Sequence, residues 1–184
     1  MPRHLAFLRA INVGGHTVRM SALRALFEAL GFRRVETFIA SGNILFDAAA
    51  RNTGPLEARI ERHLKDALGY AVATFLRSPA EVAAIAAYRP FGDADPAAAG
   101  GALMVGFLKA PPSADAEHRV LTLRAETDDF HVHGRELYWL ARGGVGTSPV
   151  GGARLERALG APATFRNVTT VRRLALKVAD AAAE

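Results

Sequence analysis

The sequence predicts an α+β protein in which a ferredoxin-like N-terminal βαββαβ half is packed on a second, smaller α+β half. Short apolar runs of strand length alternate with amphipathic stretches of helical spacing, and their order over residues 1–78 is that of a split βαβ arrangement. A chain of 184 residues is long enough for one compact unit of two subdomains. We therefore expect subdomains at 1–78 and 102–184, joined by a helix and connector over 79–101.

The predicted elements of the first half are a strand over 5–11, a helix over 20–30, a hairpin over 35–46, a helix over 55–68 and a strand over 72–76. Gly31 and Gly69 follow the two helices and are typical helix stops. Ser41-Gly42-Asn43 suits the turn of the hairpin. A single longer strand with a glycine bulge is the alternative to that hairpin.

The predicted elements of the second half are a short helix after Pro79, a strand over 103–108, a short helix over 117–123, a hairpin over 130–140 that turns at Gly134, a helix over 153–159 and a last helix over 168–178. Asn167 is a good N-cap for the last helix because its side chain can accept from an unpaired backbone N–H. The sequence shows no internal repeat clear enough to use.

Composition narrows the functional classes. No apolar run reaches the roughly 20 residues that span a bilayer, and no cleavable secretion signal is recognisable, so we expect no membrane partner. The chain has no cysteine, which excludes disulfides and thiolate chemistry and favours the cytoplasm. The net charge is +5, with cations concentrated near the C-terminus, so an anionic small molecule or nucleic acid is the expected partner.

A glycine pair, Gly14-Gly15, lies between the first predicted strand and helix, with Arg9 and Asn12 just before it. Backbone N–H groups in such a loop and the positive end of the following helix favour bound anions. The alternative is that the glycines only permit a positive-φ turn. The loop lacks the Gly-Lys-Ser/Thr of a P-loop and the spacing of GxGxxG, so nucleotide binding does not follow from it directly.

Two further polar sites accompany this loop. Ser41-Gly42-Asn43 could present a hydroxyl, an amide and N–H groups to a ligand, or serve only as a hairpin turn. Arg166 and Asn167 precede the N-terminus of the last helix, where an anion is favoured. The expected ligand-binding residues are Arg9, Asn12, Gly14, Gly15, Ser41, Gly42, Asn43, Arg166 and Asn167.

Three other features have weaker functional interpretations. His131 and His133 share one face of a strand, but no third metal ligand is evident, so exposed histidines are expected and no metal or cofactor is predicted. The glycine-rich loop over 143–152 suits either an anion-binding nest or a flexible connector. The basic face of the last helix suits either a solvated surface or a protein contact.

Three stretches together resemble the bacterial Domain of Unknown Function 1697 family. They are Arg9-Ala10-Ile11-Asn12-Val13-Gly14-Gly15, Thr37-Phe38-Ile39-Ala40-Ser41-Gly42-Asn43 and Thr164-Phe165-Arg166-Asn167-Val168-Thr169-Thr170. The resemblance implies two α+β halves, the first ferredoxin-like, and brings no established activity. The chain departs from the family pattern at six positions. The residues usual there are Gly, Tyr, Gln, Trp, Asn and Lys, and this chain has, in the same order, Ala10, Phe38, Ala40, Val168, Thr169 and Pro149.

The first functional hypothesis is a cytoplasmic protein that binds an anionic ligand, a nucleotide or a nucleic-acid phosphate, in a cleft between the halves. The second is a transferase or hydrolase that uses the same cleft, although the sequence supplies no obvious general base or nucleophile–base pair. The third is a protein-interaction module that uses the basic C-terminal helix. Substrate, oligomeric state and biological role do not follow from the sequence.

Overall fold

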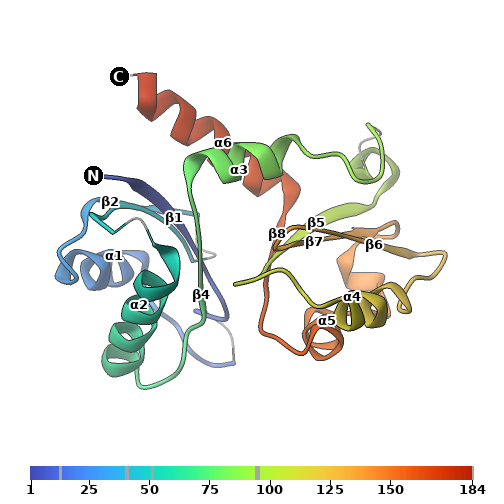
Figure 1. Ribbon diagram of the computed structural model, residues 1–184, viewed down its shortest axis with the longest axis horizontal. Helices are drawn as coiled ribbons and strands as arrows, with labels where there is room; N and C mark the ends of the chain where they lie inside the picture. The colour runs from blue at the N-terminus through green and yellow to red at the C-terminus, as the bar shows by residue number, and fades with distance from the viewer. Residues whose placement is uncertain (13, 40–41, 51, 94–95, 184) are drawn as a thin grey trace. The chain divides into compact units, whose positions relative to one another are not determined.

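The computed structural model describes residues 1–12, 14–39, 42–50, 52–93 and 96–183 (Figure 1). The chain divides into unit 1, Met1–Glu81, and unit 2, Val82–Glu184, which is the longer stretch. The described residues form two four-stranded antiparallel sheets and six α-helices. The predicted α+β class is confirmed.

Unit 1 contains β1 (Arg3–Leu8), α1 (Met20–Ala29), β2 (Arg33–Phe38), β3 (Asn43–Asp47), α2 (Thr53–Leu68) and β4 (Thr74–Arg77). The strand order in its sheet is β2-β3-β1-β4, and every neighbouring pair is antiparallel. Each helix therefore connects two strands that lie on either side of a third strand, which is the predicted split βαβ arrangement. The hairpin, and not the single bulged strand, is the correct interpretation of residues 35–46.

One face of this sheet packs on α1 and α2 (Figure 1). Leu23 and Phe27 of α1 and Ile60 of α2 are fully buried, because the apolar residues of each helix recur on one side. They meet the alternate residues Ile44 and Phe46 of β3 in one core cluster. This packing positions the loops at the end of β1 and at the β2–β3 turn.

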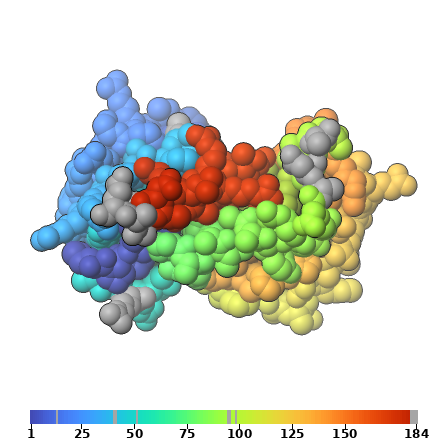
Figure 2. All heavy atoms as spheres, turned by 90° about the horizontal axis from the view of Figure 1, so that it is seen from above, coloured from blue at the N-terminus to red at the C-terminus, as the bar shows by residue number. Residues whose placement is uncertain are grey.

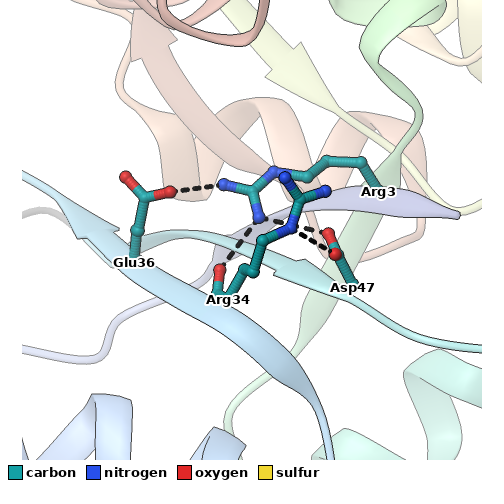
Figure 3. A network of polar contacts seen from close by, with 4 residues as sticks. All are labelled: Arg3, Arg34, Glu36 and Asp47. Atoms are coloured by element: carbon teal, nitrogen blue, oxygen red, sulfur yellow. Dashed lines mark hydrogen bonds and ion pairs between the residues drawn. The ribbon is translucent and has the colours of Figure 1, made fainter. Parts of the chain in front are cut away.

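An ion-pair network lies on the opposite face of the same sheet (Figure 3). Arg3 donates to Glu36 at 2.6 Å and to Asp47 at 3.1 Å, and Arg34 donates to Asp47 at 2.6 Å. Burial acts to raise the pKa of Asp47, but the hydrogen bonds from Arg34 and Arg3 outweigh it and hold that pKa below its ordinary value of 3.8. The network ties the first three strands together where the β2–β3 register shifts between Arg33 and Glu36.

Unit 2 begins within α3 (Pro79–Ala87) and continues through η1 (Pro96–Ala99), β5 (Ala102–Phe107), α4 (Ala114–Leu121), β6 (Asp128–His133), β7 (Glu136–Ala141), η2 (Val145–Thr147), α5 (Gly152–Leu159), β8 (Thr164–Asn167) and α6 (Val168–Ala183). Its strand order is β6-β7-β5-β8, again antiparallel throughout. Figure 1 shows α4 and α5 on one face of this sheet, where Trp139 lies in the core cluster with Leu155. Figure 2 shows α3 and α6 side by side.

The sequence did not predict β8. Only four residues long, β8 includes Arg166 and Asn167, which the sequence suggested as the approach to a helix cap. In the structure Thr164 pairs with Phe107 and Arg166 with Val105, so the strand completes the second sheet. A strand this short carries too little alternation for its period to be recognised.

The two units have the same topology, although the sequence showed no usable repeat. Each contains the element order βαββαβ, and a helix follows the last strand of each, α3 after β4 and α6 after β8. The strand orders of the two sheets correspond one to one. The matching backbone bonds, Leu8 N–H to Gly42 at 2.9 Å and Leu108 N–H to Arg135 at 3.0 Å, align the two first strands. In this register Phe7-Leu8-Arg9-Ala10 corresponds to Phe107-Leu108-Lys109-Ala110. Three identical residues and one Arg–Lys pair are too few to stand out without the register.

Among the described residues, no helix has both the length and the apolar character that crossing a membrane requires.

Candidate functional site

The structure brings two of the predicted motifs together in unit 1, at one end of its sheet. Gly42 accepts a hydrogen bond from Leu8, and a Cβ on Gly42 would lie only 2.8 Å from Cγ2 of Ile11. Asn43 is paired with Phe7 across β1 and β3. The end of β1 and the β2–β3 turn are therefore in contact, and only glycine fits at position 42. Ser41 lies outside the described residues.

Asn12 and Asn43, both predicted to bind a ligand, make hydrogen bonds that stabilise these turns. Oδ1 of Asn12 accepts from the backbone N–H of Val18 at 2.6 Å, which closes the loop between β1 and α1. Asn43 is buried, and its Nδ2 donates to the carbonyl of Phe38 at 3.1 Å. These bonds are the local turn-forming interactions typical of asparagine. The two side chains therefore have structural roles in the turns, and their contact with a ligand stays a prediction.

Gly14 and Gly15 form the exposed tip of the loop that Asn12 closes. Both have left-handed backbone, with φ of 64° and 86°, as the structural interpretation of the pair expected. Among the described residues, neither backbone N–H donates a hydrogen bond, and a Cβ added at either glycine would meet no atom within 4 Å. The exposed tip therefore contains two backbone donors that have no acceptor among the described residues.

The helix that follows the loop begins without a side-chain cap. Arg19 is the N-cap residue of α1, it makes no capping hydrogen bond, and the first turn of the helix contains no acidic residue. The N–H groups of a first helical turn need partners from outside the helix, and the helix dipole adds positive potential there. Arg9, half-buried at the start of the loop, and exposed Arg19 add formal positive charge.

An aromatic pair lies against the same loop. The ring of exposed His16 stacks on Tyr70, with centroids 3.8 Å apart and planes 20° apart. The Tyr70 hydroxyl donates to the carbonyl of Ile11 at 3.1 Å, which ties the α2–β4 connection to the loop. Neither ring was a candidate from the sequence, because the two residues are 54 positions apart and their contact is visible only in the fold.

Arg166 and Asn167 lie in unit 2, and their convergence with the loops of unit 1 stays a prediction. Arg166 is buried, its Nη1 donates to Thr164 at 2.8 Å and to the carbonyl of Phe165 at 2.9 Å, and burial lowers its pKa to about 10. Oδ1 of Asn167 accepts from the N–H of Thr169 at 2.9 Å, which is the hydrogen bond expected of an N-cap of α6.

Arg77 is the counterpart of Arg166 in unit 1, and it was not among the residues that the sequence pointed to. Arg77 pairs with Leu5 on β1 as Arg166 pairs with Val105 on β5, and its side chain is fully buried. In both units the arginine is followed by a polar capping residue and then a helix. Ser78 accepts from the N–H of Glu81 at 3.2 Å. The order arginine, capping residue, helix occurs in both units, and this repeated order is the sequence signal that could have identified Arg77.

The predicted alternatives in unit 2 have structural explanations. His131 is half-buried and not exposed as expected, and its Nε2 lies 2.8 Å from the Tyr88 hydroxyl. His133 is exposed as expected, and its ring stacks on that of Tyr88. Within the described residues no group of three or more His, Asp or Glu side chains could hold a metal ion. Ser148, in the glycine-rich loop, donates to buried Asp128 at 2.7 Å, which ties that loop to β6.

Comparison with protein-family models identifies the family. Residues 1–138 match the model described as a protein of unknown function, DUF1697. The chain belongs to the DUF1697 family. The matched residues include the Gly14-Gly15 loop and the β2–β3 turn but end before β8, so Arg166 and Asn167 lie outside the match.

One solved structure shares the DUF1697 fold over nearly the whole chain. The conserved bacterial protein SP0830 from Streptococcus pneumoniae superposes with a TM-score of 0.69 at 21% identity, covering 96% of this chain and 98% of that one. At this identity the similarity shows the fold alone. No curated protein matches the sequence.

Proposed function

We propose that this DUF1697 protein binds a phosphate-bearing ligand at the loop between β1 and α1, residues 9–20. The observation that carries the proposal is the exposed glycine pair in the loop that leads to α1: the N–H groups of Gly14 and Gly15 have no acceptor among the described residues, and the N-terminus of α1 has no side-chain cap. Backbone donors and a helix dipole that point at the same space form a common phosphate-binding arrangement. A bound phosphate would supply acceptors to these donors.

The charges around the loop support an anion over a neutral ligand. Arg9 and Arg19 bracket the loop, and the whole chain carries a net charge of +5. Charge-assisted hydrogen bonds between arginine and phosphate are about twice as strong as neutral ones. The lack of cysteine in the sequence suits a reducing compartment, so we place this activity in the cytoplasm.

The His16–Tyr70 pair favours a nucleotide as the phosphate-bearing ligand. The His16 ring is exposed, and Tyr70 holds it from one side next to the glycine pair. A nucleobase can stack on such a ring while its phosphate contacts the loop, which needs no sequence-specific contact. This combination also suits a single-stranded nucleic acid, which carries the same groups.

Amide-resolved NMR titration tests the proposal, with inorganic phosphate, ribose 5-phosphate and AMP as probes. We expect shifts of the Gly14, Gly15 and Ser21 amides with all three, and the tightest binding with AMP. Arg19→Ala should weaken binding about tenfold, which corresponds to ~1.4 kcal/mol. Arg24→Ala is the matched control because Arg24 lies on the same helix in an exposed pair with Glu28.

Two results would contradict the proposal. One is the absence of shifts at Gly14 and Gly15 with every probe. The other is an equal loss of affinity in Arg19→Ala and Arg24→Ala, which would indicate only a general charge effect. Binding of all three probes with equal affinity would retain the phosphate site and remove the stacking of a base.

A further inference from the structure

Unit 2 contains a cavity of about 380 Å³ at the C-terminal end of β5. It lies between the β5–α4 loop and the α5–β8 loop. Its lining is largely apolar and consists of Leu108, Lys109, Ala110, Pro111, Pro112, Ser113, Leu159, Ala161 and Pro162. The volume falls within the range of small-molecule sites, about 300–1,000 Å³.

The same corner of unit 1 is occupied by a side chain. There the β1–α1 loop meets the α2–β4 loop, and Tyr70 fills the junction, packed against the unit 1 core. Its hydroxyl donates to the carbonyl of Ile11. In both units this corner lies between the loop that follows the first strand and the loop that precedes the last strand. The two first-strand loops differ beyond Leu8 and Leu108, because Ala10 is left-handed and Ile11 is buried, whereas Ala110 is not left-handed and Pro111 is exposed.

The residue that directly follows the helix C-cap differs between the two corners. The helices that precede both corners end in Ala-Leu-Gly, and both glycines, Gly69 and Gly160, are left-handed C-caps. The next residue is Tyr70 in unit 1 and Ala161 in unit 2. Alanine at that position leaves the space of a phenol ring unfilled, and Ala161 is itself part of the lining.

We propose that the unit 2 cavity binds a small aromatic molecule with one ring. The apolar lining, with buried Leu108 and Leu159, suits the faces of the ring. The occupant takes the place of the ring that Tyr70 supplies in unit 1. This site is independent of the phosphate-binding loop.

Phenol is the direct probe of this site. In NMR titrations of the full chain we expect shifts at Leu108, Leu159 and Ala161, and nuclear Overhauser effects between the phenol ring and the leucine methyl groups. Ala161→Tyr should fill the cavity and weaken phenol binding at least about tenfold, because its ring takes the place of the ligand. Ala161→Ser, which adds one atom, should retain binding.

The duplicated fold supplies a second, independent test. Tyr70→Ala should open an equivalent cavity in unit 1 and create a second phenol site, with shifts at Leu68 and Ile11. Wild-type protein without Overhauser contacts to Leu108 or Leu159 would overturn the proposal. Unchanged phenol affinity in a folded Ala161→Tyr variant would do the same. Binding of cyclohexanol as tight as that of phenol would also overturn it, because the site would then select no aromatic ring.

Discussion

Ala10 has a strained backbone conformation at the start of the β1–α1 loop. Its φ is 58°, in the left-handed region where a Cβ crowds the backbone. It directly follows the arginine that begins the loop, at the position where the family pattern has glycine. Exposed Ile39, at the β2–β3 turn that contacts this loop, is also left-handed with φ of 49°. Two of the three left-handed non-glycine residues in the described part of the chain therefore lie where the two predicted motifs meet, and the third, Arg34, lies in β2 at the register shift.

Ala10→Gly is expected to stabilise the protein. Glycine adopts the left-handed region without the steric cost, so the free energy of unfolding should rise by about 0.5–1 kcal/mol despite the greater entropy of unfolded glycine. Urea denaturation measures this difference. Ala25→Gly is the control, because Ala25 is an exposed position within α1 where the same change should cost about 1 kcal/mol. A loss of stability in both variants would refute the assigned strain.

At the scale of elements, the edge strand β4 is protected by the helix beside it. The N–H of Leu76 donates to Glu57 at 2.8 Å, and the N–H of Thr74 donates to Glu61 at the same distance. Both glutamates lie on α2, one turn apart, so they face the same strand. Backbone groups that would otherwise offer an edge for pairing with another chain are thus satisfied within the unit.

Glu57→Ala should destabilise the protein by about 1–3 kcal/mol, because it leaves the buried N–H of Leu76 without its acceptor. Hydrogen exchange at the Leu76 amide should accelerate in the same variant. Glu28→Ala removes a glutamate from an exposed ion pair on α1 and should change stability by less than about 0.5 kcal/mol. Equal effects of the two substitutions would show that the bond to the strand contributes little.

A helix or strand could be predicted from the sequence when it was long and ended at a recognisable stop residue such as glycine. The helix that became α2 was recognised because an apolar stripe ran to Gly69, and Gly69 is indeed its left-handed C-cap. The four residues of β8 carried no such period, and Arg166 and Asn167 belong to a polar class that argues against a buried strand. Contact between the Gly42 turn and Ile11 could not be predicted, because it depends on the pairing of β1 with β3.

For the molecule as a whole, global stability should depend on pH through a buried histidine. His4 is 4% exposed, its ring stacks on Phe46, and its Nε2 lies 3.0 Å from the carbonyl of Ala50. Burial lowers the pKa of His4 from its ordinary value of 6.5. Between the two values the unfolded chain binds a proton that folded His4 does not, so stability rises with pH in this window.

The free energy of unfolding should therefore fall as the pH drops below about 6.5, by at most about 1.4 kcal/mol per pH unit from this one group. Urea denaturation at several pH values between about 5 and 8 measures the slope. His4→Phe should flatten it. The pKa values of Asp47 and Asp128 lie below the ordinary 3.8, so their stabilising contributions are present above that pH and are lost only in stronger acid. An unchanged slope in His4→Phe would contradict the assignment.

The loops of the candidate site were more predictable from the sequence than the roles of their side chains. Glycines 14, 15 and 42 are all left-handed, as their turns required. Asn12 and Asn43 make local hydrogen bonds, and those bonds depend on where the chain folds back, which residue type alone does not determine. The repeated topology was hidden because few positions, such as Gly69 and Gly160, kept the same residue.

Because the two units have the same topology, each strand residue of unit 1 has a structural counterpart in unit 2. Phe7 with Phe107, Leu8 with Leu108 and Arg77 with Arg166 are the same residues at the same register, although little else agrees. A substitution in one unit can therefore be compared with the substitution at the corresponding position of the other, as Arg77→Ala with Arg166→Ala, so that each unit serves as an internal control for the other.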